Sequence, residues 1–134
     1  MARVRVQAFL LCDSVIFDSG GKATVQGIFD QIQSQSLPVV CPSLMVFVRL
    51  RLPRPGTCDA DFEVQTPSGA TERPLQRQRM SSGDGEIAQL FHRVLEVPLR
   101  ESGRYVWSLL IDGMKVADYP FTVVVTGSKR AAAA

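Results

Sequence analysis

Residues 44–52, Leu-Met-Val-Phe-Val-Arg-Leu-Arg-Leu, contain the clearest structural pattern in the chain. Large aliphatic side chains occupy every even position from Leu44 to Leu52, whereas Arg49 and Arg51 occupy odd positions. A period of two is typical of a β-strand with one buried face, because successive side chains point to opposite sides. A shift of one residue would bury both guanidinium groups, so the pattern predicts a strand whose even positions face the core.

Turn sequences divide most of the remaining chain into short apolar runs. The strongest turn signal is Asp-Gly at 112–113, which tolerates the positive φ angles of a type I′ turn and predicts a hairpin between residues 105–111 and 115–125. An earlier turn, Asp-Ser-Gly-Gly at 18–21, predicts a strand over residues 22–29. Further strands are expected at residues 4–12, 58–65 and 75–80, the last of them at a sheet edge.

The same alternation predicts which side chains of two strands face the core. In the first strand these are Val4, Val6, Ala8, Leu10 and Cys12, and because the opposite face becomes apolar at Phe9 and Leu11, the far end of this strand is expected to be covered on both sides. In residues 58–65 they are Cys58, Ala60, Phe62 and Val64.

Two other segments are less regular. Residues 86–95 have apolar side chains at helical spacing, but we interpret them as a strand because a lone helix would interrupt a series of hairpins. Residues 34–43 contain two prolines and are expected to form an irregular crossover between sheets.

The series of short strands and turns predicts an all-β fold, a single antiparallel β-sandwich of about seven to eight strands. A length of 134 residues fits one domain, which we expect to span residues 1–127. Residues 128–134 end in four alanines and are expected to form a frayed tail, because so short a run cannot nucleate a helix.

Composition and charge narrow the classes of partner and compartment. The formal net charge is only +2, and a strong nucleic-acid binder usually has a marked basic excess, so a nucleic-acid partner is not expected. The three cysteines are too few and too scattered for a disulfide framework, which favours a reducing, cytoplasmic compartment. No run approaches the roughly 18–20 apolar residues of a membrane span, so membrane association is not expected.

The sequence offers little for catalysis. Its one histidine, His92, is the only candidate base for a nucleophile such as Cys41 or Cys58, and burial of Cys58 on an apolar face would raise its pKa. A zinc site needs about four nitrogen or sulfur ligands at short spacings. The three acidic residues within 59–63 are interpreted as a solvated face rather than a calcium site. We therefore expect no enzyme activity, no metal and no cofactor.

Arginine, which outnumbers lysine twelve to three, supplies the candidate binding site. If two arginine-rich stretches are neighbours in space, they form a patch that binds an acidic protein surface, a phosphate or single-stranded nucleic acid. The patch residues are Phe47, Arg49, Arg51, Arg54, Arg77 and Arg79. Alternatively, the arginines pair across strands with carboxylates and form no binding site. The candidate carboxylates are Asp59, Asp61, Glu63 and Glu72.

Several short motifs follow one another along the chain. They are Leu-Leu-Cys-Asp at 10–13, Gly-Gly-Lys at 20–22, Gly-Ile-Phe-Asp-Gln-Ile at 27–32, Leu-Pro at 37–38, Gly-Arg-Tyr at 103–105 and Pro-Phe-Thr-Val at 120–123. Together they resemble a family of short, uncharacterised bacterial proteins known only as a domain of unknown function. The resemblance implies an immunoglobulin-like or similar β-sandwich and a bacterial origin, and it carries no activity, cofactor or binding residue. Tyr105, two residues after Gly103, is expected to return its hydroxyl to nearby backbone, as in the tyrosine corner of sandwich folds.

Three functions remain open at this stage. The first is a non-catalytic interaction or structural module that self-associates or docks to a larger assembly, because sandwich domains bind through sheet edges and end loops. The second is a domain that binds a small ligand, a carbohydrate or an anion, through the loops at residues 18–22 and 81–86. The third is an enzyme with a Cys–His pair. A protein partner or self-association is the expected mode of action.

Overall fold

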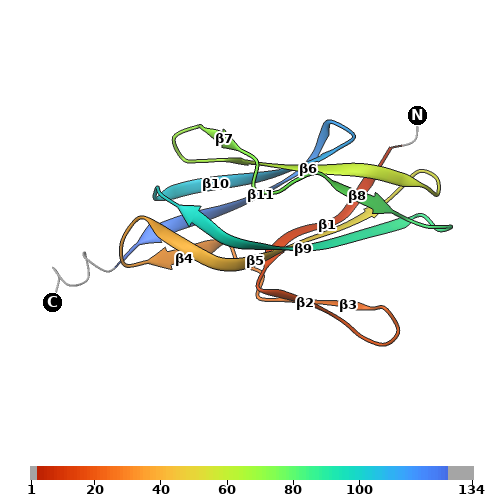
Figure 1. Ribbon diagram of the computed structural model, residues 1–134, viewed down its shortest axis with the longest axis horizontal. Coiled ribbons are helices and arrows are strands. Elements are labelled where there is room, and N and C mark those ends of the chain that lie inside the picture. The colour runs from red at the N-terminus through yellow and green to blue at the C-terminus, as the bar shows by residue number, and fades with distance from the viewer. Residues whose placement is uncertain (1–2, 127–134) are drawn as a thin grey trace.

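Two β-sheets pack face to face, and a separate hairpin lies beside them (Figure 1). The computed structural model describes residues 3–126. The three-stranded sheet has the order β1-β5-β9, with β1 (Arg5–Cys12), β5 (Val39–Arg51) and β9 (Ile87–Leu99). The six-stranded sheet has the order β4-β11-β10-β6-β7, and β8 also pairs with β6. Its strands are β4 (Gln31–Ser34), β6 (Thr57–Gln65), β7 (Thr71–Glu72), β8 (Gln78–Ser81), β10 (Gly103–Ile111) and β11 (Met114–Val125).

The prediction of an all-β sandwich is confirmed, with differences in strand number and direction. Eleven strands lie within the described residues rather than seven or eight, because several are only two to four residues long. All pairings are antiparallel except that of β4 with β11, which is parallel. The domain limits of 1–127 stay a prediction, and the predicted tail at 128–134 lies outside the described residues.

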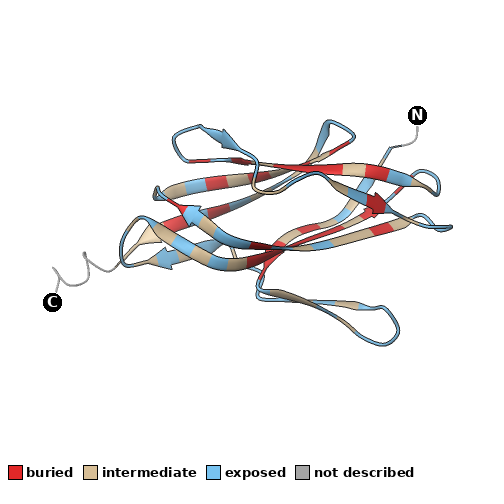
Figure 2. Cartoon of the chain, in the orientation of Figure 1, coloured by how far each residue is buried: buried red, intermediate tan, exposed pale blue. Residues whose placement is uncertain are grey.

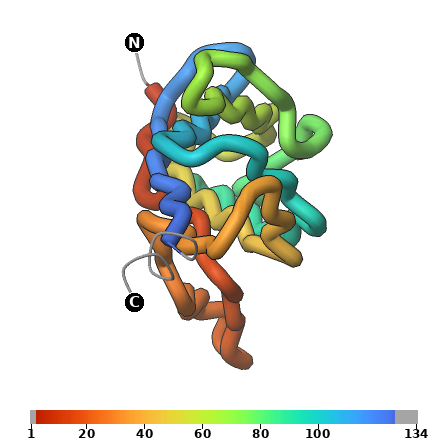
Figure 3. The backbone as a smooth tube through the Cα atoms, turned by 90° about the vertical axis from the view of Figure 1, so that its left-hand side faces the viewer, coloured from red at the N-terminus to blue at the C-terminus, as the bar shows by residue number. Residues whose placement is uncertain are grey.

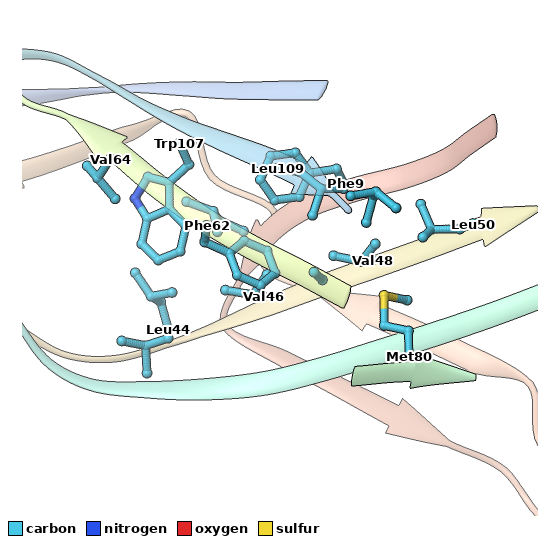
Figure 4. Close-up of a cluster of buried hydrophobic side chains, with 14 of the residues drawn as sticks. Phe9, Leu44, Val46, Val48, Leu50, Phe62, Val64, Met80, Trp107 and Leu109 are labelled. Carbon is cyan, nitrogen blue, oxygen red and sulfur yellow. The ribbon is translucent and has the colours of Figure 1, made fainter. Parts of the chain in front are cut away.

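The core lies between the two sheets, where the buried positions in Figure 2 concentrate. The even residues of 44–52 are all buried and face this core, as predicted. They meet the inward side chains of β6, also as predicted, together with Trp107 and Leu109 of β10 and Met80 of β8 (Figure 4). The Asp-Gly turn is confirmed too, since Asp112 and Gly113 have φ angles of 49° and 85° and join β10 to β11.

The prediction for the first strand is wrong at Ala8 and Leu10, but its far end is covered on both sides as expected, because Leu11 and Cys12 are both 0% exposed. A β-bulge shifts the register between Val6 and Ala8, so the inward face changes from even to odd positions. Phe9 and Leu11 therefore enter the core, whereas Ala8 and Leu10 do not.

The irregular crossover between sheets that we expected at residues 34–43 is present but shorter: residues 35–38 connect β4 of the six-stranded sheet to β5 of the three-stranded sheet, and β5 already begins at Val39. Val39 and Cys41 pack against the core from odd positions, and the even pattern starts only at Leu44. The change occurs at Pro42, which has no N–H to donate to the ladder. Opposite it in β9 lies Glu96, in the left-handed region with φ of 54°. Matching irregularities in both strands thus keep the two ends of the sheet in register.

Three other segments differ in extent from the predictions. Residues 86–95 fall almost entirely within β9, which confirms the strand interpretation. The strand predicted at 22–29 covers only β3 (Ala23–Gln26), which pairs with β2 (Ser14–Phe17) in the separate hairpin. The edge strand predicted at 75–80 is limited to β8, Gln78–Ser81. β3 ends directly before Gly27, which has a positive φ of 71°.

Tyr105 confirms the predicted tyrosine corner, a feature of immunoglobulin-like sandwiches. Its hydroxyl donates to the carbonyl of Glu101 and accepts from the amide of the same residue, both at 3.2 Å. Its ring stacks on Phe121 with a centroid distance of 5.3 Å. Gly103 has a φ of 121°, and a Cβ there would approach Pro67 to 3.0 Å. The motif thus anchors the start of β10 and has a structural role.

The hairpin of β2 and β3 projects from the sandwich, as the tube in Figure 3 shows. Its turn matches the prediction, because the Asp18 carboxylate accepts from the amides of Gly20 and Lys22 at 2.8 and 2.9 Å. Next to its turn, Phe17 packs on Phe91 of β9 with a centroid distance of 4.8 Å. The hairpin therefore leans on the outer side of the three-stranded sheet.

Candidate functional site

The outer side of the three-stranded sheet carries a set of arginines that we call the arginine face. Alternation fixes its members, because the inward residues are even-numbered in β5 from Leu44 onward and in the first half of β9. The outward side chains are Arg5 and Gln7 of β1, Arg49 and Arg51 of β5, and Gln89, Phe91, Arg93 and Leu95 of β9.

Arg49 lies at the centre of the arginine face and is held by neutral side chains. Its Nε donates to Oε1 of Gln7 at 2.7 Å, and its Nη1 donates to Oε1 of Gln89 at 2.6 Å. These bonds come from the neighbouring strands on both sides, so the guanidinium is fixed in place by the sheet. Glutamine orients the group without cancelling its charge, which leaves a full positive charge on this face.

Arg93 extends the same arrangement along β9. Its Nη1 donates to Oγ of Ser43 at 3.2 Å, again a neutral acceptor. On either side of it, Phe91 and Leu95 are 50% and 66% exposed. The arginine face therefore combines positive charge with exposed apolar surface along one strand.

Two arginines lie directly opposite each other at the end of the arginine face, where Arg5 of β1 pairs with Arg51 of β5. With Arg3, Pro53 and Glu86 they line a cleft of about 230 Å³. Within this cleft, Nη2 of Arg51 forms an ion pair with Oε1 of Glu86 at 3.7 Å. Both side chains are about half exposed, at 53% and 47%, so the pair is weakened by solvent.

On the outer side of the six-stranded sheet, arginines are paired with carboxylates, and we call this side the paired face. At its centre Asp61 of β6 is only 4% exposed. Its carboxylate accepts from Nε of Arg77 at 3.1 and 3.2 Å and lies 3.0 Å from Nη2 of the same residue. Arg73 lies 3.6 Å from Asp61 and 3.9 Å from Glu63. The charges of Arg73 and Arg77 are therefore neutralised within the fold, whereas Arg79 on the same face donates to Oγ1 of Thr57 at 3.2 Å.

The structure does not bring the predicted binding patch together. Arg49 and Arg51 lie on the arginine face. On the paired face, Arg77 directly precedes β8 and Arg79 lies within it. Arg54 lies in the turn that connects the two sheets. For Arg77, the alternative of cross-strand pairing with a carboxylate holds.

Phe47 does not contribute to a surface patch, because it is only 5% exposed. It points to the outer side of the sheet, but it pairs in the ladder with Phe91, on which the hairpin residue Phe17 packs. Its strand β5 also contacts β2. The hairpin thus covers a part of the sheet that strand alternation alone predicted to be open.

Sequence reasoning missed Arg3, Arg5 and Arg93, although the alternation of residues 3–7 contained a usable signal. Arg3, Arg5 and Gln7 alternate with apolar residues, just as Arg49 and Arg51 do. The missing information was that β1 and β5 are neighbours in one sheet, which places the two sets side by side.

The thiols give little support to nucleophilic catalysis. Burial raises the pKa of Cys12, Cys41 and Cys58, so all three are held in the protonated form at neutral pH. His92 pairs with Val46, which is five residues along β5 from Cys41. Five residues of strand span roughly 16 Å, too far for a nucleophile and its base.

Neither a metal centre nor a membrane span is found in the part of the chain that the structure describes. Within residues 3–126 no three histidine, cysteine, aspartate or glutamate side chains are placed to hold a metal ion. The same residues contain no helix with the length and hydrophobicity needed to cross a bilayer.

Comparison with known proteins gives a family and a shared fold. Residues 7–124 match DUF6941, a family of unknown function. The sequence matches no curated protein. Among solved structures, the chain resembles Pseudomonas fluorescens alkylpurine DNA glycosylase AlkC bound to DNA containing an abasic site analog, with a TM-score of 0.55 and 12% identity. The match covers 92% of this chain but 31% of the glycosylase, so it shows the fold alone.

Two further structures are similar at lower scores. Beta-glucosidase 3B from Thermotoga neapolitana, in complex with alpha-D-glucose, has a TM-score of 0.48 and 17% identity over 66% of this chain and 15% of the glucosidase. An immunoglobulin-like protein from Pseudomonas aeruginosa has a TM-score of 0.36 and 13% identity over 91% of this chain and 97% of that protein.

Proposed function

The chain belongs to the DUF6941 family of unknown function, and we propose that it is a non-catalytic module that docks an acidic protein partner on its arginine face. The observation that carries this proposal is the position of Arg49 between two glutamines. A guanidinium that is held rigidly but not neutralised is prepared for a carboxylate, because less side-chain freedom is lost when the partner binds.

The apolar part of the arginine face supports a protein as the partner. Protein interfaces are enriched in arginine and aromatic residues, and their centres exclude water. Phe91 and Leu95 supply exposed apolar area beside Arg93 on the same strand. A partner with acidic and apolar side chains on one surface complements both parts of the face.

A second copy of this chain is a poorer fit to the arginine face. In a two-fold symmetric contact the same patch meets itself. The arginines at positions 5, 49, 51 and 93 would then approach their own copies, with Glu86 as a single nearby carboxylate on each side. Repulsion between like charges disfavours that contact and favours an acidic partner.

The proposal is tested with a fluorescent 20-residue peptide rich in aspartate, glutamate and leucine, titrated with the wild-type protein. We expect saturable binding that weakens as salt rises from about 50 to 200 mM, because exposed charges are screened over about 10 Å at 0.1 M. Arg49→Glu should weaken binding by about tenfold or more, since a charge-assisted hydrogen bond becomes a repulsion.

The matched control is Arg104→Glu, which reverses the charge of an exposed arginine on β10 in the other sheet. If both variants lose affinity equally, the binding reflects net charge alone and the proposal fails. Single-stranded DNA is the second probe, since the glycosylase with a similar fold is bound to DNA. Tighter binding of DNA than of the peptide at equal ionic strength contradicts a protein partner.

A further inference from the structure

We propose that the cleft formed by Arg3, Arg5 and Arg51 is a binding site for one oxyanion group, a carboxylate or a phosphate. This inference rests on the proposed function, because it assigns the cleft to a charged group that the docking partner carries. The site lies at the end of the arginine face where β1 begins and β5 ends.

Two like charges are paired directly at this site. Arg5 and Arg51 are opposite each other in an antiparallel ladder, so their side chains leave the same face of the sheet about 5 Å apart at Cβ. Like charges in such a position destabilise a sheet. An oxyanion between the two guanidinium groups reverses that effect, because both can donate hydrogen bonds to it.

The residues that line the cleft carry a net positive charge. Three guanidinium groups meet one carboxylate, that of Glu86, which gives a formal charge of +2. Glu86 lies 3.7 Å from Arg51 and is about half exposed, so it does not neutralise the site. A second carboxylate or a phosphate would bring the cleft close to neutrality.

The cleft is small and has a partly apolar lining. The cleft measures about 230 Å³, below the roughly 300–1,000 Å³ that is typical for drug-sized ligands, so it suits a single small group. Pro53 provides an apolar wall. The amide of Leu52 donates to the carbonyl of Glu86 at 2.7 Å and fixes the end of β5 against the start of β9. Apolar walls strengthen the attraction of an anion by excluding water.

The test is a titration of the wild-type protein with inorganic phosphate at constant ionic strength, followed by NMR of the Arg51 and Leu52 amides. We expect saturable shifts at these amides, and a loss of affinity of about tenfold or more in Arg5→Gln. The matched control Arg104→Gln, which removes an exposed charge from β10, should bind phosphate as the wild type does.

A thermal melt in phosphate-free buffer separates loss of the site from loss of the fold. Arg5→Gln removes a like-charge contact, so its melting temperature should equal or exceed that of the wild type. Arg3→Gln, which lies outside the strand, is the second variant and should also weaken phosphate binding. Stable folding together with lost binding supports the proposal.

The chemical source of the oxyanion is resolved by two short peptides that differ at one position, glutamate in one and phosphoserine in the other. The peptide that binds more tightly, and depends on Arg5, identifies the group. Absence of saturation by phosphate, or equal binding by Arg5→Gln and Arg104→Gln, overturns the cleft proposal even if the acidic peptide still requires Arg49. Saturable binding that requires Arg5 supports it even if the acidic peptide does not require Arg49.

Discussion

The two outer faces of the sandwich both carry arginines, but their charges have different partners. On the paired face, Arg77 lies against a nearly buried carboxylate, that of Asp61, and Arg73 reaches the same group. On the arginine face, Arg49 lies between two glutamines. The comparison teaches that the number of arginines on a surface does not decide its binding role, because the acceptors around them determine how much charge remains for a partner.

The two faces also show that arginine has a structural role at one site and a binding role at another. A carboxylate that is nearly buried needs its arginines, since an unpaired buried charge is strongly destabilising. Glutamine needs no positive partner, so its hydrogen bond to Arg49 contributes little to the stability of the fold. Its main effect is to hold the charge of Arg49 in place on the surface. The paired face is therefore expected to respond to mutation through stability, and the arginine face through binding.

The largest predicted effect tests the assignment of the faces themselves. Val48→Asp should destabilise the protein by about 4 kcal/mol or more, because it places a carboxylate at a position that is 0% exposed in the core. Arg49→Asp, one residue along and on the outer side, should cost about 1 kcal/mol or less. Urea denaturation followed by circular dichroism measures both values. Equal losses would show that the two faces of β5 have been assigned to the wrong sides.

The second prediction compares the carboxylates of the two faces. Asp61→Ala should cost about 2 kcal/mol, because hydrogen bonds to charged groups are worth roughly 1.5–3 kcal/mol and the arginines around Asp61 are solvent-exposed. Glu86→Ala should change stability by about 0.5 kcal/mol or less, since its ion pair with Arg51 is half exposed. The same urea experiment provides the comparison. A loss at Glu86 as large as the loss at Asp61 would remove the distinction between the faces.

Sequence alone predicted those parts of the fold that local alternation controls. The even positions of 44–52, the inward side of β6 and the turn at Asp112 were all predicted correctly, because each depends on neighbouring residues. The inward side of β1 was wrong at Ala8 and Leu10, since a β-bulge between Val6 and Ala8 shifts its register against β5. Phe47 was wrong because a hairpin from another part of the chain covers it.

The candidate site was predicted only in part for a similar physical reason. Alternation showed that Arg49 and Arg51 point outward, but not which strands lie beside them. Sheet order decides that Arg49 meets glutamines from β1 and β9, whereas Arg77 meets Asp61. Which acceptors surround each arginine therefore depends on contacts between strands far apart in sequence, and alternation within one strand does not predict them.

The smallest predicted effect converts part of the arginine face into a paired face. Gln89→Glu places a carboxylate beside Arg49, with little change in shape, and should stabilise the protein by about 0.5 kcal/mol. The same variant should weaken binding of the acidic peptide severalfold, because the charge of Arg49 is now neutralised within the fold. Thermal melts and peptide titrations measure the two effects. Unchanged peptide affinity would contradict the proposed role of Arg49.

Chemical-shift mapping of the acidic peptide on isotopically labelled protein tests the central claim most directly. We expect the perturbed amides and side chains to cluster on the arginine face, at Gln7, Arg49, Gln89 and Arg93, while Asp61 and its neighbours on the paired face remain unchanged. Perturbations centred on the paired face, or spread equally over both sheets, would contradict it.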